Sequence, residues 1–135
     1  PVVQMSIDYT KPASYHYELA RQLRALRNKN VLIVGSGNMV HNLRRVDWRR
    51  LNETFAYDWA QEADTKMRNW IESGNHQSLI DFRNQGSAFD LAIPTPEHFL
   101  PLLYVLALQD KNEEAVLLND KPVAGALTMT SVKIG

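Results

Sequence analysis

A short apolar run that stops at a glycine-rich turn is the feature that most constrains the fold of this chain. Residues 31–34 are Val-Leu-Ile-Val, and Gly35-Ser36-Gly37-Asn38 follows at once. A continuous apolar run of this length, bounded by turn residues, predicts a strand buried on both faces. Because the ends of such strands often carry the residues of a binding site, we expect functional side chains in or just after this loop.

Helical and strand patterns alternate along the rest of the chain. Leu19, Leu23 and Leu26 recur at helical steps, which predicts a helix over 13–28 whose outer face carries solvated arginines at 21, 24 and 27. The other expected elements are a strand within residues 1–8, helices over 57–73, 77–83 and 100–108, and strands over 115–118 and 127–134. This interleaving predicts the α/β fold class.

Length and charge narrow the classes of function. The 135 residues, of which 44% are hydrophobic, predict one domain with one core. The 15 Lys and Arg balance 15 Asp and Glu, and no apolar stretch reaches the ~18 residues of a membrane span, so we expect neither nucleic-acid nor membrane binding. The absence of cysteine predicts a reducing compartment, the cytoplasm, and leaves His, Asp and Glu as the strong metal ligands.

The first residues are not typical of the start of a protein. Pro1 takes the place of an initiator Met, and no signal-peptide pattern precedes the opening strand. We therefore expect this chain to be a piece of a longer protein, whose missing part precedes Pro1.

The glycine-rich loop has two interpretations. Glycines after a buried strand can let backbone N–H groups approach a phosphate. However, the dinucleotide pattern needs a third glycine where Val40 stands, and the P-loop needs a Lys followed by Ser or Thr, which is absent. We therefore prefer the alternative, a tight turn that needs glycine at positive φ.

His41 is the first candidate for chemistry. It lies seven residues beyond Val34, between Asn38 and Asn42, so a titratable imidazole follows a buried strand among amide groups. Histidine titrates near neutral pH, and amide neighbours can select its tautomer. A packed, purely structural histidine is the alternative.

His98 is the second candidate, in the stretch Pro94-Thr95-Pro96-Glu97-His98-Phe99-Leu100-Pro101. Proline is tolerated in the first turn of a helix, so His98 should lie at or just before the start of the helix over 100–108. The helix dipole there favours a neutral imidazole, which can bind a cation. Glu97 is a rival ligand, and a polar pair that only caps the helix is the alternative for both residues.

The two further histidines are weaker candidates for chemistry. We expect His16 to be packed on its helix and His76 to lie in an exposed loop beside Gly74-Asn75. Two good histidines make only part of a catalytic zinc or non-haem iron site, which usually takes three protein ligands.

Three motifs together resemble the carboxyl half of bacterial 4,5-DOPA extradiol dioxygenases, within the class III extradiol ring-cleavage family. They are the segments 34–43, around the Gly-Asn-x-x-His-Asn pattern, 94–105, around Pro-Glu-His, and 129–135 at the close. The opening residues 3–8 match as well, so the similarity runs nearly end to end.

The resemblance implies a three-layer α/β fold with a central mixed sheet, of which residues 1–135 form the carboxyl-terminal part of a single catalytic domain. It also implies a mononuclear metal, Fe(II) or Zn(II), that binds a catechol, DOPA-like substrate and O₂. His41 falls on the family's acid/base histidine, which is also a candidate metal ligand, and His98 on a metal-ligand histidine. The amino-terminal half, with its Gly-His-Gly-Ser-Pro and Ser-Ala-His-Trp motifs, is absent from this chain and would be its partner.

Two other functions stay open at this point. The chain could be a non-catalytic piece that serves as the structural partner of an amino-terminal half. A zinc hydrolase that uses the same two histidines to activate water is also physically allowed, because zinc lowers the pKa of bound water.

Overall fold

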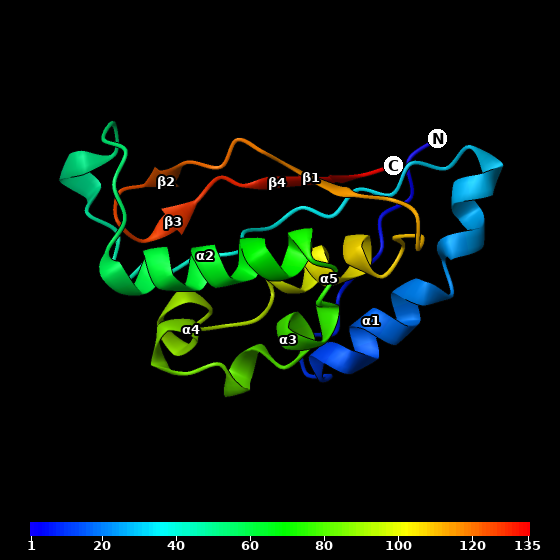
Figure 1. Ribbon diagram of the computed structural model, residues 1–135, viewed down its shortest axis with the longest axis horizontal. Helices are drawn as coiled ribbons and strands as arrows, with labels where there is room; N and C mark the ends of the chain where they lie inside the picture. The colour runs from blue at the N-terminus through cyan, green and yellow to red at the C-terminus, as the bar shows by residue number, and fades with distance from the viewer.

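The computed structural model describes residues 1–135 and confirms the α/β class (Figure 1). The helices are α1 (Ala13–Arg21), α2 (Asp58–Glu72), α3 (His76–Ile80), α4 (Ser87–Ala92) and α5 (Leu100–Leu106), with 3₁₀ turns η1 (Arg24–Lys29), η2 (Trp48–Arg50) and η3 (Phe82–Asn84). The strands are β1 (Ala115–Leu118), β2 (Pro122–Val123), β3 (Leu127–Thr128) and β4 (Ser131–Ile134).

The strands form two small antiparallel sheets, β1 with β4 and β2 with β3. Ala115 pairs with Ile134 and Leu118 with Ser131, whereas Val123 pairs with Leu127. In Figure 1 the strands and the long extended segments lie along one side of α2, and α3 and α4 lie along the other. The strand expected over 127–134 is therefore two strands, which belong to different sheets.

Helix α2 supplies the centre of the core. Ala60, Ala63, Met67 and Ile71 recur at steps of three and four and are all at most 1% exposed. They pack with residues of α4 and α5, including Phe89 and Leu103, in one cluster of 16 buried side chains. After α2 the chain turns at Gly74, whose φ of 69° is the left-handed conformation that glycine adopts without strain.

The helix expected over 13–28 ends at Arg21, and the expectation of solvated arginines is wrong for two of them. Arg27 donates to Glu113 Oε1 at 2.6 Å and to the Leu108 carbonyl at 2.7 Å, and Arg24 donates to the Gln109 carbonyl at 3.2 Å. Ion pairs with residues distant in sequence therefore favour the 3₁₀ turn η1 over a continued α-helix. Contacts of this kind, between residues distant in the chain, leave no mark on the periodicity of residues 13–28.

The strand expected over 31–34 does not form. Leu32 and Val34 are 87% and 76% exposed, and residues 32–37 neither donate nor accept a backbone hydrogen bond. Residues 1–7 also lack backbone hydrogen bonds, so the opening strand is absent too. A strand needs a neighbouring strand, and no segment of this chain pairs with these two.

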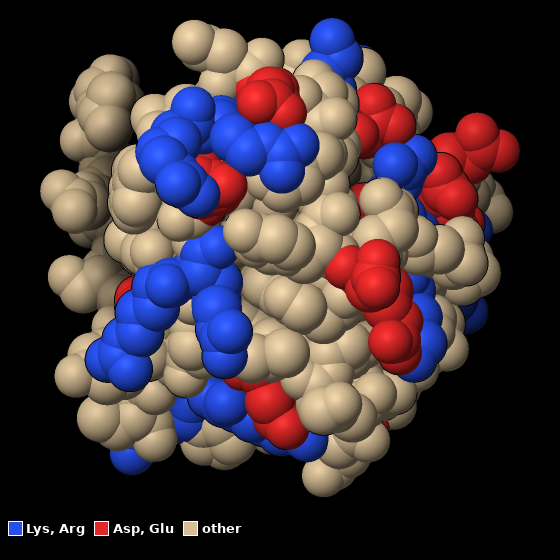
Figure 2. Space-filling model, turned by 90° about the vertical axis from the view of Figure 1, so that its left-hand side faces the viewer, with Lys and Arg blue, Asp and Glu red and all other residues tan.

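Ion pairs join many of the exposed charges. At the end of the molecule that holds η2, Figure 2 shows acidic side chains among the basic ones. Arg50 pairs with Glu53 at 2.6 Å, and Arg68 pairs with Asp120 at 2.8 Å. None of the helices has both the length and the apolar character needed to cross a bilayer.

The two remaining histidines lie on the helical side. His16 is packed as expected, with 0% exposure, and its Nε2 lies 3.1 Å from the Asp8 carbonyl oxygen. Because a carbonyl only accepts, Nε2 carries the proton and Nδ1 accepts from the Tyr104 hydroxyl at 3.0 Å. His76 corrects the expectation of an exposed loop: it is the first residue of α3, half-buried, and its Nδ1 lies 2.8 Å from the Tyr17 hydroxyl.

Burial of His16 predicts a loss of stability in acid. Burial lowers the pKa of His16 below the ordinary value of 6.5, so protonation is disfavoured in the folded chain. The stabilising contribution is therefore full above pH 6.5 and is lost as the pH falls toward the lower pKa of the folded state. His76 acts in the same direction, because burial lowers its pKa as well.

We expect His16→Leu to lower the free energy of unfolding by about 1–3 kcal/mol at neutral pH, because Tyr104 and the Asp8 carbonyl lose their partner. The variant should also lose less stability than the wild type between about pH 7.5 and about pH 5.5. Urea unfolding at both pH values measures this. An unchanged pH dependence in the variant would contradict the role given to His16.

Candidate active site

The fold brings His41 and His98 together. Their ring centroids are 4.0 Å apart, and the ring planes are inclined by 25°, so the two imidazoles are stacked. Neither ring has a side-chain hydrogen-bond partner within the chain. The two histidines that the sequence indicates as candidate site residues therefore lie side by side in one site.

Hydrogen bonds between two segments hold this pair. The His41 N–H donates to the Ala92 carbonyl at 2.9 Å, and the Asn38 N–H donates to the His98 carbonyl at 2.8 Å. Asn42 is buried, and its Nδ2 donates to the Leu91 carbonyl at 2.7 Å. The segments 38–42 and 91–98 are thus joined on both sides of the histidine pair.

A strand completes the support of the His41 loop. Asn38 Nδ2 donates to the Thr128 carbonyl at 2.7 Å, and the Thr128 N–H donates to the Val40 carbonyl at 3.2 Å. His41 itself forms an isolated antiparallel bridge with Leu127. The loop that carries His41 therefore lies between β3 on one side and the segment that carries His98 on the other.

The glycines of the loop have a different role from the expected one. Neither Gly35 nor Gly37 has a positive φ, so the tight-turn explanation is wrong. Instead, a Cβ on Gly35 would lie 2.6 Å from the Pro101 carbonyl oxygen, and one on Gly37 would overlap the His98 carbonyl oxygen. Glycine is needed here because two backbones approach closely.

His98 lies just before α5, as expected. Phe99 is the N-cap residue of α5, Pro101 is in the first turn, and no side chain caps the helix. The Phe99 and Leu100 N–H groups donate to the Pro96 carbonyl, both at 2.9 Å. Neither Glu97 nor His98 caps α5, which removes the purely capping interpretation.

Glu97 remains a neighbour of the pair. Its Oε1 accepts from the Thr95 hydroxyl at 2.6 Å, and this bond, more than the nearby imidazoles of His98 and His41, holds the pKa of Glu97 below its ordinary value. Sequence reasoning missed Thr95; its place between Pro94 and Pro96, two residues before Glu97, is the signal that could have indicated it.

Burial lowers the pKa of His41, and the neighbouring His98 lowers it further. Both causes disfavour the charged form of the His41 imidazole. The arrangement offers nitrogen ligands or a base. It is not a full ligand set, because no three His, Cys, Asp or Glu side chains converge anywhere in the chain.

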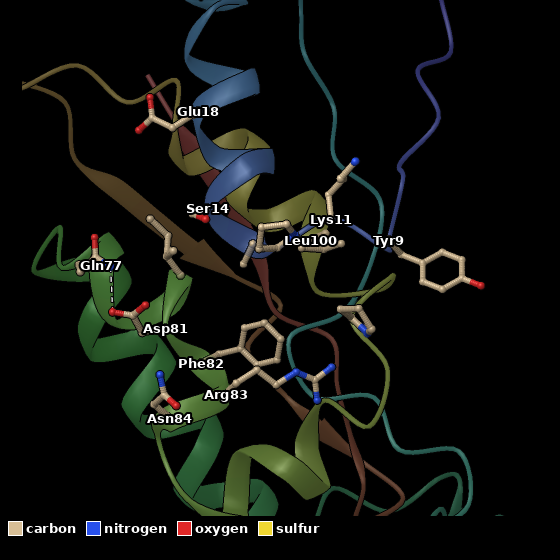
Figure 3. A pocket seen from close by; sticks show the side chains of 14 residues that line it. Tyr9, Lys11, Ser14, Glu18, Gln77, Asp81, Phe82, Arg83, Asn84 and Leu100 are labelled. Carbon is tan, nitrogen blue, oxygen red and sulfur yellow. Dashed lines mark hydrogen bonds between the residues drawn. The ribbon is translucent and has the colours of Figure 1, made fainter.

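A separate cleft of about 400 Å³ opens between the start of α1, α3 and the segment before α5. Figure 3 shows Lys11 and Arg83 in this cleft. It also shows Asp81 beside Gln77, whose Nε2 donates a hydrogen bond to Asp81 Oδ2 at 2.8 Å. Neither His41 nor His98 lines it. The cleft is therefore distinct from the histidine pair.

Comparison with known proteins identifies the class. Residues 1–128 match the family described as the catalytic LigB subunit of aromatic ring-opening dioxygenase. The 4,5-DOPA dioxygenase extradiol of Escherichia coli (strain K12) is 39% identical over 138 residues, covering 100% of this chain and 50% of that protein. The protein of the same name from Beta vulgaris is 27% identical, covering 98% and 48%.

A crystal structure of an uncharacterized protein from Escherichia coli K12 has a TM-score of 0.82 and 37% sequence identity, and covers 96% of this chain and 53% of that one. This chain belongs to the LigB family of aromatic ring-opening dioxygenases, which confirms the resemblance seen in its motifs. It spans about half the length of the curated relatives it matches.

We expect Thr95→Val to raise the pKa of Glu97 toward its ordinary value, because the Thr95 hydroxyl donates the hydrogen bond that lowers it most. An NMR titration of the Glu97 carboxyl carbon measures the shift. Thr10→Val is the matched control, since Thr10 donates the corresponding bond to Asp8, and it should leave Glu97 unchanged. An unaltered Glu97 pKa in Thr95→Val would refute this assignment.

Proposed function

We propose that this chain contributes part of the active site of an extradiol dioxygenase that opens a catechol, DOPA-like ring with O₂ at a mononuclear metal. The observation that carries the proposal is the stacking of His41 on His98 in a member of the LigB family. Both histidines come from the motif segments on which the family resemblance rests.

The donor set suits the proposed metal. Imidazole nitrogen binds Fe(II) and Zn(II) well, and neither ring is hydrogen-bonded to another side chain. His98 would hold the metal, with His41 and Glu97 as the neighbouring candidates. When bound, the metal would orient the catechol and dioxygen and pass electron density between them.

His41 acts as the acid/base in this proposal. Its lowered pKa leaves an imidazole nitrogen free to accept a phenolic proton near neutral pH. The protonated ring can then return that proton to an oxygen on which negative charge develops. Glu97 lies close enough to favour the transient imidazolium electrostatically.

The rest of the site would come from an amino-terminal half of the same domain. Relatives are about twice as long as this chain, and the histidine pair lacks further ligands. The backbone groups of residues 32–37 are unpaired, and Leu32 and Val34 are exposed. An extended segment with these features can pair with a strand of another segment. We place the protein in the cytoplasm, which the absence of cysteine supports.

The incomplete ligand set favours one second candidate, a structural half without activity of its own. Purified chain with Fe(II) and a catechol, with and without an added amino-terminal half, separates the two. The dioxygenase proposal expects ring opening by the mixture to be lost when this chain carries His41→Ala, whereas a purely structural half expects that activity to remain. Hydrolysis of esters or amides without oxygen uptake would support the zinc hydrolase instead.

We expect His41→Ala, in the full-length protein, to lower the rate of ring cleavage by about 10²–10⁴-fold, the usual contribution of a general acid/base. Metal content should stay close to that of the wild type, because His98 holds the ion. Metal analysis beside the activity assay checks this. Loss of metal in proportion to activity would make His41 a ligand instead.

We expect His98→Ala to lose metal and activity together. Glu97→Gln, which removes the charge of the neighbouring residue with almost no change in side-chain volume, should keep most of both. Metal titrations of the two variants side by side measure the contrast. If Glu97→Gln loses the metal and His98→Ala retains it, the ligand is the carboxylate and the assignment must be exchanged.

A further inference from the structure

The two histidine-bearing segments approach each other closely at Gly37. Any Cβ there would overlap the carbonyl oxygen of His98 and would lie 3.0 Å from its carbonyl carbon. The next residue, Asn38, donates its N–H to that same carbonyl at 2.8 Å. Because Gly37 has no positive φ, an alanine at this position is excluded by the contact and not by backbone conformation.

Few other contacts fix His98. Its side chain is exposed, and it precedes the first residue of α5. The other bonds between the segments, from His41 to Ala92 and from Asn42 to Leu91, lie before the proline-rich stretch. The direct contacts between the His98 backbone and the His41 loop are therefore those of Gly37 and the Asn38 N–H.

We propose that Gly37 is a positioning residue: by lacking a side chain, it lets the His98 backbone approach the His41 loop and so sets the stacked distance of the two imidazoles. The role of Gly37 in placing the His98 backbone follows from the contacts described above. Its consequence for metal binding rests on the proposed function.

Gly35 provides a matched control. Its added Cβ would also be too close to backbone, 2.6 Å from the Pro101 oxygen, and 3.0 Å from Val105 Cγ2. That strain acts on α5 itself and not on His98. Both alanine variants should lose stability, whereas only Gly37→Ala should alter the histidine pair.

The test uses the full-length protein without metal. Stacked rings shift each other's proton signals, so NMR of the imidazole C–H groups of His41 and His98 reports their stacking. We expect Gly37→Ala to lose most of this mutual shift and Gly35→Ala to keep it, with urea unfolding recorded for both. Calorimetric titration with Zn²⁺ should show an affinity at least about tenfold weaker in Gly37→Ala, a loss typical of displaced ligand support.

A third variant keeps the proposal testable if Gly37→Ala does not fold. Asn38→Ala removes only the bond from Asn38 Nδ2 to the Thr128 carbonyl and loosens the loop from the opposite side. It should weaken the mutual ring shift in part. Wild-type ring shifts in a folded Gly37→Ala, equal losses in Gly35→Ala, or an unaffected Asn38→Ala would each overturn the proposal.

The two proposals fail differently. If the full-length wild type does not bind Zn²⁺, the metal role proposed for the pair fails, while the ring shifts of the variants still decide the role of Gly37. If the wild type binds Zn²⁺ and Gly37→Ala binds it equally well, the metal role stands and Gly37 is not a positioning residue.

Discussion

The proposed active site depends on the close contact between the segments 37–42 and 91–98. Backbone groups of Asn38 and His41 donate to carbonyls of His98 and Ala92, so the two loops are fastened by hydrogen bonds that do not involve the reactive side chains. The buried cluster around α2 and α5 supports the second loop, and Thr128 supports the first. The imidazoles thereby have no side-chain hydrogen-bond partners, as the proposed roles in metal binding and proton transfer require.

Sequence reasoning succeeded where the cause is local. The period of Ala60, Ala63, Met67 and Ile71 predicts α2 almost to its ends, and Pro101 places His98 before a helix. It failed where the cause is distant in sequence. Arg24 and Arg27 bind the segment 108–113, which ends α1 early, and no composition argument contains that contact. His76 is likewise half-buried beside a residue distant in sequence, Tyr17, whose hydroxyl lies 2.8 Å from His76 Nδ1.

The strand expected over 31–34 fails for a related reason. An apolar run shows that a segment is suited to the interior of a sheet. It becomes a strand only when a neighbouring strand provides the partners of its backbone hydrogen bonds. Here Leu32 and Val34 remain exposed, and the chain spans about half the length of its relatives. The glycines of the same loop were recognised as special from the sequence, yet their actual partner, the His98–Pro101 backbone, could only be found in three dimensions.

We propose that His98, stacked on His41, provides a metal-binding nitrogen. Anomalous X-ray diffraction from crystals of the full-length protein loaded with Zn²⁺ tests it most directly, because the ion is located without reference to activity. We expect a single strong peak at about 2.0–2.1 Å from an imidazole nitrogen of His98. A metal bound elsewhere, with His98 outside its coordination sphere, would contradict it.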